Sequence, residues 1–189
     1  MNYSLIMKIG LLWILAGILI ATPVLFRGIS RTTPVVAMSQ DTSRPIVNEV
    51  PEIKGAPIHL TMESVGISVD IAPGYYDEKT HTWTLSKDKA HFATITSQPN
   101  NKTGNTFIYG HNRWAVFTKL VDAKVGDTAV ITTDNNHRFT YTLREIADVD
   151  PRSTAYLQPH NSPILTLQTC SGMWYEQRHM LTFDFTKVD

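Results

Sequence analysis

The chain has 189 residues, with 17 basic and 17 acidic side chains and a single cysteine. The length suits one domain with something attached, because domains usually span about 100 to 200 residues. A formal net charge of zero, without a block of five or more like charges, argues against a nucleic-acid binder, which needs a basic surface. One cysteine cannot form an internal disulfide, so cysteine pairing says nothing about the compartment.

The first element is an apolar span at residues 9–26, which has no charged residue and is flanked by Lys8 and Arg27. A helix of this length spans the hydrocarbon core of a bilayer, about 30 Å thick. We therefore expect a transmembrane anchor within residues 1–27. The competing interpretation is a cleaved secretory signal with its cleavage site near residues 35–37, although the apolar run is longer than is usual for such a signal. Both interpretations export the rest of the chain.

Residues 28–56 contain Pro34, Pro45 and Pro51 and show little apolar periodicity. This composition predicts an extended tether that holds a domain away from the membrane. The globular domain is then predicted to span residues 57–189.

The domain has the period of strands more than that of helices. Strands are predicted at residues 58–62, 65–71, 106–109, 127–133, 138–149, 164–169 and 180–185. Helical segments are limited to residues 114–120, a short stretch at 87–94 and a turn at 153–157. Seven or eight short strands indicate an all-β barrel or a sandwich, and the pattern alone does not choose between them.

Cys170 ends one predicted strand. Side chains alternate along a strand, so Leu165 and Leu167 point to one side while Gln168 and Cys170 point to the other. If the leucines face the core, Cys170 lies on the outer face, where a reactive thiol is better placed than a packing residue. A thiol with a pKa of about 8.5 needs a base or a cation nearby to act as a nucleophile.

Candidates for these neighbours are among the seven histidines and the arginines. His111 differs from the other histidines because it follows a strand and Gly110, which lets the backbone turn and approach closely. Arg178 opens the last strand and lies beside Cys170 if the two final strands pair. On position alone, an exposed arginine at a strand edge is an equally good interpretation.

These residues carry a family resemblance. Residues 167–170, Leu-Gln-Thr-Cys, resemble the Leu-x-Thr-Cys motif of sortases, and residues 109–112, Tyr-Gly-His-Asn, resemble their Gly-His segment. Arg178 stands where a sortase arginine opens the last strand. The resemblance covers about residues 57–189 and implies a closed antiparallel β-barrel with a few short helices.

The resemblance also implies a cysteine transpeptidase that cleaves an LPXTG-like sorting signal after its threonine. Cys170 would be the nucleophile, His111 the general acid and base, and Arg178 the donor to the substrate carbonyl or oxyanion. Thr169, Asn112 and Trp174 are predicted to contact the substrate. The implied acceptor is an amine of a peptidoglycan precursor. The chemistry requires no cofactor or metal, and nothing in the sequence indicates modulation by calcium.

Several alternatives stay open at this stage. A papain-like peptidase is excluded because its cysteine precedes its histidine, and no Gly-x-Ser-x-Gly motif supports a serine hydrolase. The tether lacks the Asp-Pro-aromatic lid signature of pilin-polymerising relatives, which favours attachment of surface proteins to the cell wall over pilus assembly. An inert, membrane-anchored β-domain that binds an envelope partner is the remaining alternative. The expected location is a single-pass membrane protein with an extracellular catalytic domain.

Overall fold

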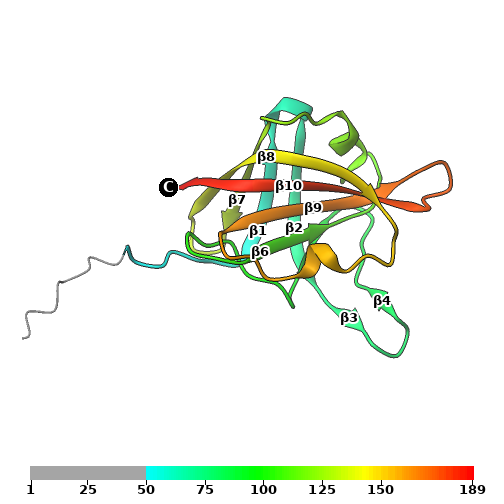
Figure 1. The fold of residues 1–189 in the computed structure, drawn as a ribbon, viewed down its shortest axis with the longest axis horizontal. Coiled ribbons are helices and arrows are strands. Elements are labelled where there is room, and N and C mark those ends of the chain that lie inside the picture. The colour runs from blue at the N-terminus through cyan, green and yellow to red at the C-terminus, as the bar shows by residue number, and fades with distance from the viewer. Residues whose placement is uncertain (1–49) are drawn as a thin grey trace, which may run out of the picture. The chain divides into compact units, whose positions relative to one another are not determined.

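The structure is a computed structural model, and it describes residues 50–189. Eight strands close into a barrel in the order β1-β2-β5-β6-β9-β10-β8-β7, with β1 pairing with β7 to close it (Figure 1). The strands are β1 (Pro57–Met62), β2 (Ile67–Gly74), β5 (Ala90–Ala93), β6 (Asn105–Tyr109), β7 (Thr128–Thr133), β8 (Arg138–Val149), β9 (Ile164–Ser171) and β10 (Gln177–Val188). The prediction of an all-β barrel is confirmed, and the sandwich is excluded.

The expectation of an all-antiparallel barrel is wrong in one respect. Strands β2 and β5 are parallel, and so are β6 and β9. A parallel pair needs a crossover connection in place of a tight hairpin. Between β6 and β9 this connection contains β7 and β8, and between β2 and β5 it contains the separate hairpin of β3 (Tyr76–Asp77) and β4 (Thr82–Trp83).

The barrel interior is filled by alternate side chains of its strands, as period-two patterning predicts. Tyr141 and Leu143 from β8 are buried, and so are Leu165 and Leu167 from β9. The largest fully buried side chains include those of Phe117, Phe139, Phe183, Leu60, Met62, Ile108, Leu120, Ile131, Leu143, Leu165 and Leu167. Most of them point inward from strands, so the core lies inside the barrel.

The helical content is small. Three 3-10 helices occur in the described residues: η1 (Glu63–Val65), η2 (Thr118–Asp122) and η3 (Ala155–Leu157). The helix expected at residues 114–120 is only η2, and η3 lies within the turn expected at 153–157. The helical stretch expected at 87–94 is wrong, because residues 90–93 form β5. All four residues of β5 are buried, and a short apolar run of this kind does not distinguish a strand from a helix by its period.

The segment that precedes β1 lies along the barrel. Asn101 Oδ1 accepts a hydrogen bond from the Ile53 amide at 2.9 Å, and Asn135 Nδ2 donates to the Lys54 carbonyl at 2.8 Å. The described residues 50–189 contain no helix that is long and apolar enough to cross a bilayer. The predicted span at 9–26 and most of the predicted tether lie outside the described residues.

Candidate active site

Cys170 lies near the end of β9 and is half-buried. Leu165 and Leu167 on the same strand belong to the barrel core, so strand alternation places Cys170 on the outer face. Cys170 therefore lies on the face of the strand that the sequence predicted. A half-buried thiol on the outer face can meet a ligand without unfolding of the barrel.

His111 lies in the turn that leaves β6, and its neighbours fix it beside the end of β9. The Gly110 amide donates to the Gln168 carbonyl at 3.1 Å, which extends the parallel pairing past the end of β6. Asn112 Nδ2 donates to the Cys170 carbonyl at 2.9 Å. The Gly110 backbone and the Asn112 side chain, on either side of His111, are both bonded to β9 and hold His111 beside the strand end that carries Cys170.

Gly110 is required for this turn because no Cβ fits at its position. A Cβ there would lie 2.7 Å from Val116 Cγ1 and 3.1 Å from Phe117 Cδ2, both on buried side chains. Contacts that short force the neighbours to move. The glycine therefore lets the segment after His111 fold closely against the barrel.

Arg178 is paired with Cys170 across β9 and β10. Directly opposite residues of antiparallel strands have Cα atoms about 4.5 to 5.5 Å apart and side chains on one face. Nη1 of Arg178 donates to the carbonyls of Tyr175 at 3.1 Å and Gln177 at 3.0 Å. Its Nη2 and Nε make no hydrogen bond to residues 50–189, so a fixed cation offers N–H donors on the face that carries the thiol.

The electrostatic setting favours a neutral imidazole. Partial burial lowers the pKa of His111, and the nearby positive charge of Arg113 and the neighbouring His91 lower it further. Both causes disfavour the imidazolium. The site therefore combines a thiol, a histidine that is readily neutral and a permanent cation on three adjacent strand ends.

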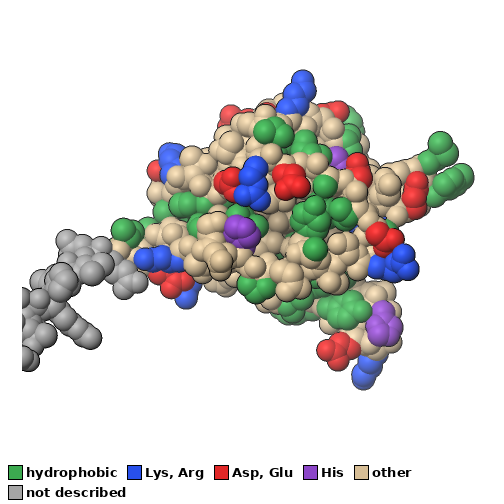
Figure 2. Space-filling model, in the orientation of Figure 1, with side chains coloured by type: hydrophobic (Ala, Val, Ile, Leu, Met, Phe, Trp, Pro, Cys, Tyr) green, Lys and Arg blue, Asp and Glu red, His purple; other side chains and the backbone are tan. Residues whose placement is uncertain are grey.

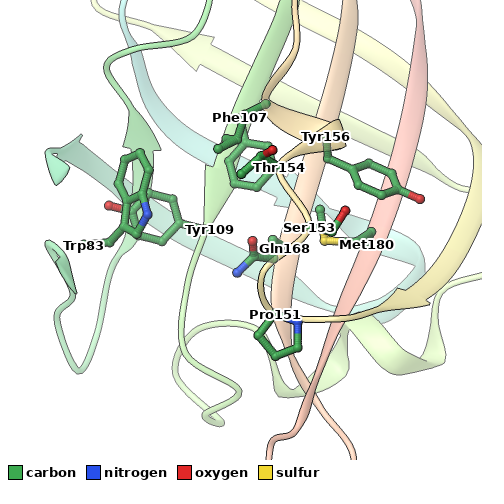
Figure 3. Close-up of a pocket in the computed structure, with 10 residues that line it drawn as sticks. Trp83, Phe107, Tyr109, Pro151, Ser153, Thr154, Tyr156, Gln168 and Met180 are labelled. Carbon is green, nitrogen blue, oxygen red and sulfur yellow. The ribbon is translucent and has the colours of Figure 1, made fainter. Parts of the chain in front are cut away.

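A cavity of about 120 Å³, whose lining is drawn in Figure 3, opens on the same outer face. It lies two residues along the strands from these three residues. Gln168, Tyr109 and Met180 in its lining lie two residues from Cys170, His111 and Arg178, respectively, and a strand rises about 3.3 Å per residue. The cavity is thus about 7 Å along the strands from the thiol. Its lining is largely aromatic and aliphatic: Trp83, Phe107, Tyr109, Pro151, Ser153, Thr154, Tyr156, Leu157, Gln168 and Met180.

The two walls of the cavity come from distant parts of the chain. Figure 3 shows Trp83 of β4 beside Tyr109 on one side and Tyr156 on the other side. The ring centroids of Trp83 and Tyr109 are 5.3 Å apart in an edge-on arrangement. Opposite them, the segment between β8 and β9 is held by Asn105, whose Nδ2 donates to the Tyr156 carbonyl at 2.6 Å. The cavity is therefore a lined groove with a floor of β6, β9 and β10.

Comparison with known proteins places this fold and site in a family. The Sortase domain family model matches residues 60–183, about two thirds of the chain. The chain belongs to the sortase family. No curated protein matches the sequence. Sortases are cysteine transpeptidases, so membership supports that class of enzyme in general terms.

Solved sortases share the fold at low sequence identity. Sortase C from Clostridium perfringens SM101 has 19% identity and a TM-score of 0.57, with 71% of this chain and 72% of that chain covered. Sortase A from Corynebacterium diphtheriae has 18% identity and a TM-score of 0.58, with coverage of 72% and 63%. Sortase E1 from Streptomyces coelicolor has 19% identity and a TM-score of 0.55, with coverage of 71% and 90%. The likeness at these identities concerns the fold and does not assign a sortase class.

The residues predicted to contact the substrate of this sortase lie in three different settings. Asn112 is half-buried beside Cys170, within the site. Thr169 is fully buried, and its hydroxyl donates to the Gly110 carbonyl at 3.1 Å. This side chain has no accessible surface and holds the turn before His111, so the substrate contact predicted for Thr169 stays a prediction that only its backbone could fulfil.

Trp174 lies in the loop between β9 and β10, is 83% exposed and does not line the cavity. Figure 2 shows hydrophobic side chains projecting at the tip of this loop. The loop itself is ordered by hydrogen bonds: the Trp174 amide donates to Glu176 Oε2 at 2.8 Å, and Arg178 holds the Tyr175 carbonyl. The structure does not bring Trp174 to the groove, and its contact with substrate stays a prediction.

Sequence reasoning missed the groove of the sortase barrel. Gln168 was placed on the outer face by parity, but Trp83, Tyr109 and Tyr156 were not connected with it. Trp83 and Tyr156 are 73 residues apart in the chain and come together only because both segments contact β6, at Tyr109 and Asn105 respectively. The one available signal was the group of three aromatic residues Tyr75, Tyr76 and Trp83, which no predicted core strand explained.

Proposed function

We propose that this sortase is a membrane-anchored transpeptidase that cleaves an LPXTG-like sorting signal after its threonine and transfers the exported protein to an amine of a cell-wall precursor. The observation that supports this most is the convergence of Cys170, His111 and Arg178 on adjacent strand ends. The cavity, about 7 Å from them along the strands, provides a place for the residues before the scissile bond.

In the first step the Cys170 thiolate attacks the threonine carbonyl carbon and forms a carbon–sulfur bond. The peptide carbon–nitrogen bond then breaks, and the leaving amine takes a proton from the His111 imidazolium. The thioester that remains is attacked by the incoming amine, which gives its proton to the neutral imidazole. A new amide forms, and the thiolate is released. His111 thus returns to its starting protonation state after each cycle.

Arg178 supplies the charge that the tetrahedral intermediates need. Its Nη2 and Nε are unpaired within residues 50–189 and lie on the same face as the thiol. A preorganised donor of this kind contributes about 2.7 to 4 kcal/mol to the stabilisation of an oxyanion in acyl transfer. The carbonyls of Tyr175 and Gln177, both bound by Nη1, keep the guanidinium from swinging into solvent.

The groove suits an apolar residue upstream of the threonine. Alternate residues of an extended peptide are about 7 Å apart, which matches the separation of the cavity from Cys170. Phe107, Leu157 and Met180 give the cavity apolar walls, as the leucine or proline of an LPXTG-like signal requires. The anchor proposed for residues 9–26 would hold the barrel on the extracellular side of the membrane, next to its substrates.

We favour attachment to a cell-wall precursor over pilin polymerisation because residues 28–56 lack an Asp-Pro-aromatic segment. The test uses the full-length protein in detergent micelles, a fluorescence-quenched Leu-Pro-X-Thr-Gly peptide, and triglycine as the amine acceptor. We expect cleavage after threonine with a ligated product, and no turnover by Cys170→Ala. Unchanged turnover in Cys170→Ala, or none in the parent across many signal variants, would overturn the transpeptidase proposal.

The accessibility of the Cys170 thiol distinguishes the proposed transpeptidase from the inert-domain alternative. A methanethiosulfonate reagent should label Cys170 in the folded parent protein, and sorting-signal peptide should slow the labelling. A thiol that stays unlabelled until the barrel unfolds would favour the inert domain.

A further inference from the structure

A polar cluster ties together the strand ends that carry the site. Asp148 Oδ1 accepts a hydrogen bond from Ser171 Oγ at 2.7 Å and lies 3.0 Å from Nδ1 of His179. These three residues come from β8, β9 and β10, respectively. Ser171 directly follows Cys170, and His179 directly follows Arg178. One carboxylate oxygen is thus bonded to the sequence neighbours of both proposed catalytic residues.

The cluster lies on the opposite face of the sheet from the thiol. His179 is opposite Thr169 on β9 and opposite Asp148 on β8, so all three side chains point to one face. Two residues further along β10, Leu181 on the same face belongs to the barrel core. The cluster therefore sits behind the site, at the rim of the barrel, and cannot touch a substrate bound on the outer face.

The protonation states follow from the geometry. The hydrogen bond from Ser171, opposed by partial burial and assisted by His179, lowers the pKa of Asp148. An ionised carboxylate can only accept, so Nδ1 of His179 carries the proton that it donates to Asp148. Nε2 of His179 is buried and has no partner within residues 50–189.

A buried polar atom without a partner costs stability, and an apolar side chain would avoid that cost. The histidine is 8% exposed, and the next two side chains on the same face towards the end of β10, Leu181 and Phe183, are buried and apolar. Stability alone therefore does not explain a histidine at this position. Its ordered contact is the hydrogen bond to Asp148, which points to a role in the placement of the strand ends.

We propose that Asp148 and His179 are positioning residues for the proposed transpeptidase reaction: through Ser171 and His179, the Asp148 carboxylate holds the backbone that places Cys170 opposite Arg178. Thr169 completes the support, because its hydroxyl holds the Gly110 carbonyl next to His111. The inference rests on the proposed function where it concerns kcat. Its prediction for amide hydrogen exchange does not depend on that function.

The test compares His179→Asn, His179→Leu and Asp148→Ala in the full-length protein in detergent. Asparagine retains a donor near the position of Nδ1, whereas leucine has a similar volume and no donor. We expect kcat to fall about tenfold or more in His179→Leu and Asp148→Ala, as for the loss of a hydrogen bond to a charged group, with KM changed less than twofold. His179→Asn should keep kcat within about threefold of the parent, and His179→Leu should unfold at a urea concentration no lower than the parent.

The control is Asp184→Ala, because Asp184 also joins β10 to β8, through Nη1 of Arg144 at 2.7 Å, but lies away from the site. It should leave kcat unchanged. Amide hydrogen exchange gives a readout that needs no turnover: the peptide covering residues 168–179 should exchange at least threefold faster in Asp148→Ala and His179→Leu and unchanged in Asp184→Ala.

Three results would overturn the positioning role: an unchanged kcat in Asp148→Ala and His179→Leu, equal losses in His179→Asn and His179→Leu, or unchanged exchange over residues 168–179. A parent protein that turns over no peptide contradicts the proposed function instead. The exchange measurement then still decides whether the cluster holds the strand ends.

Discussion

At the scale of single residues, burial and nearby positive charge together lower the pKa of His111. Partial burial is the main cause of its lowered pKa, and the guanidinium of Arg113, two residues further on, is the next. A positive neighbour disfavours the imidazolium form. Since the proposed mechanism uses the imidazolium to protonate the leaving amine, Arg113 sets the upper pH at which that form is available.

Replacement of Arg113 by glutamine should therefore raise the pKa of His111. The imidazolium would persist to higher pH, so the alkaline limb of the single-turnover acylation rate should move upward in pH. The measurement is this rate from pH 5 to 9 in the parent and in Arg113→Gln. Arg152→Gln removes an exposed arginine whose partner is Asp150, not His111, and serves as the control. A limb that moves downward or stays in place in Arg113→Gln would contradict this assignment.

At the scale of elements, the groove depends on how the segment between β8 and β9 is fixed to the barrel. Asn105 at the start of β6 is 3% exposed, and its Oδ1 accepts from the Thr166 hydroxyl at 3.0 Å. Its Nδ2 donates to the carbonyl of Tyr156, which lines the cavity. One buried amide thus joins two strands of the floor to one wall of the groove.

We expect Asn105→Ala to destabilise the fold by about 1 to 3 kcal/mol, because it leaves buried polar groups without partners. The loosened wall should raise KM for the sorting-signal peptide several-fold while kcat changes little. Urea unfolding and steady-state kinetics measure the two effects.

Asn101→Ala is the matched control, because the Asn101 amide also makes two hydrogen bonds, to the backbone of Ile53 and Pro51, away from the groove. It should lose stability without a change in KM. Equal KM values in Asn105→Ala and the parent would show that the wall does not contact the peptide.

At the scale of the whole molecule, the sequence predicted what depends on local pattern. The alternation of Leu165, Leu167 and Cys170 was enough to place the thiol on the outer face, and the barrel followed from the resemblance. The four residues of β5 were misassigned because a short buried strand has no period of its own. The local pattern did not predict features that depend on which strands pair and in which register.

The polar cluster behind the site shows why pairing could not be predicted. Asp148 faces His179 only because the register of β8 against β10 shifts by one residue near Arg144. A shift of one residue turns every later side chain to the other face. The sequence around Arg144 has no glycine or turn residue to mark this bulge. The cavity was missed for a related reason, because its two walls come together only where both contact β6.

Burial inside the barrel also sets a limit on alkaline stability. Tyr141 is 1% exposed, and this burial raises its pKa, although a hydrogen bond from Thr106 partly opposes the shift. In the unfolded chain a tyrosine ionises at a pKa of about 10. The folded protein keeps the phenol protonated above that pH, so unfolding releases a proton. The stability linked to Tyr141 is therefore complete below about pH 10 and declines as the pH rises further.

Tyr141→Phe should remove this decline. At pH 7 the variant should be less stable than the parent by about 1 kcal/mol, because the hydrogen bond with Thr106 is lost. Above pH 10 the difference should shrink by about 1.4 kcal/mol per pH unit and then reverse. Urea unfolding from pH 7 to 11.5 measures the change, with Tyr75→Phe as the control because Tyr75 is 61% exposed. Parallel stability curves for the parent and Tyr141→Phe would mean that the buried phenol ionises without unfolding of the barrel.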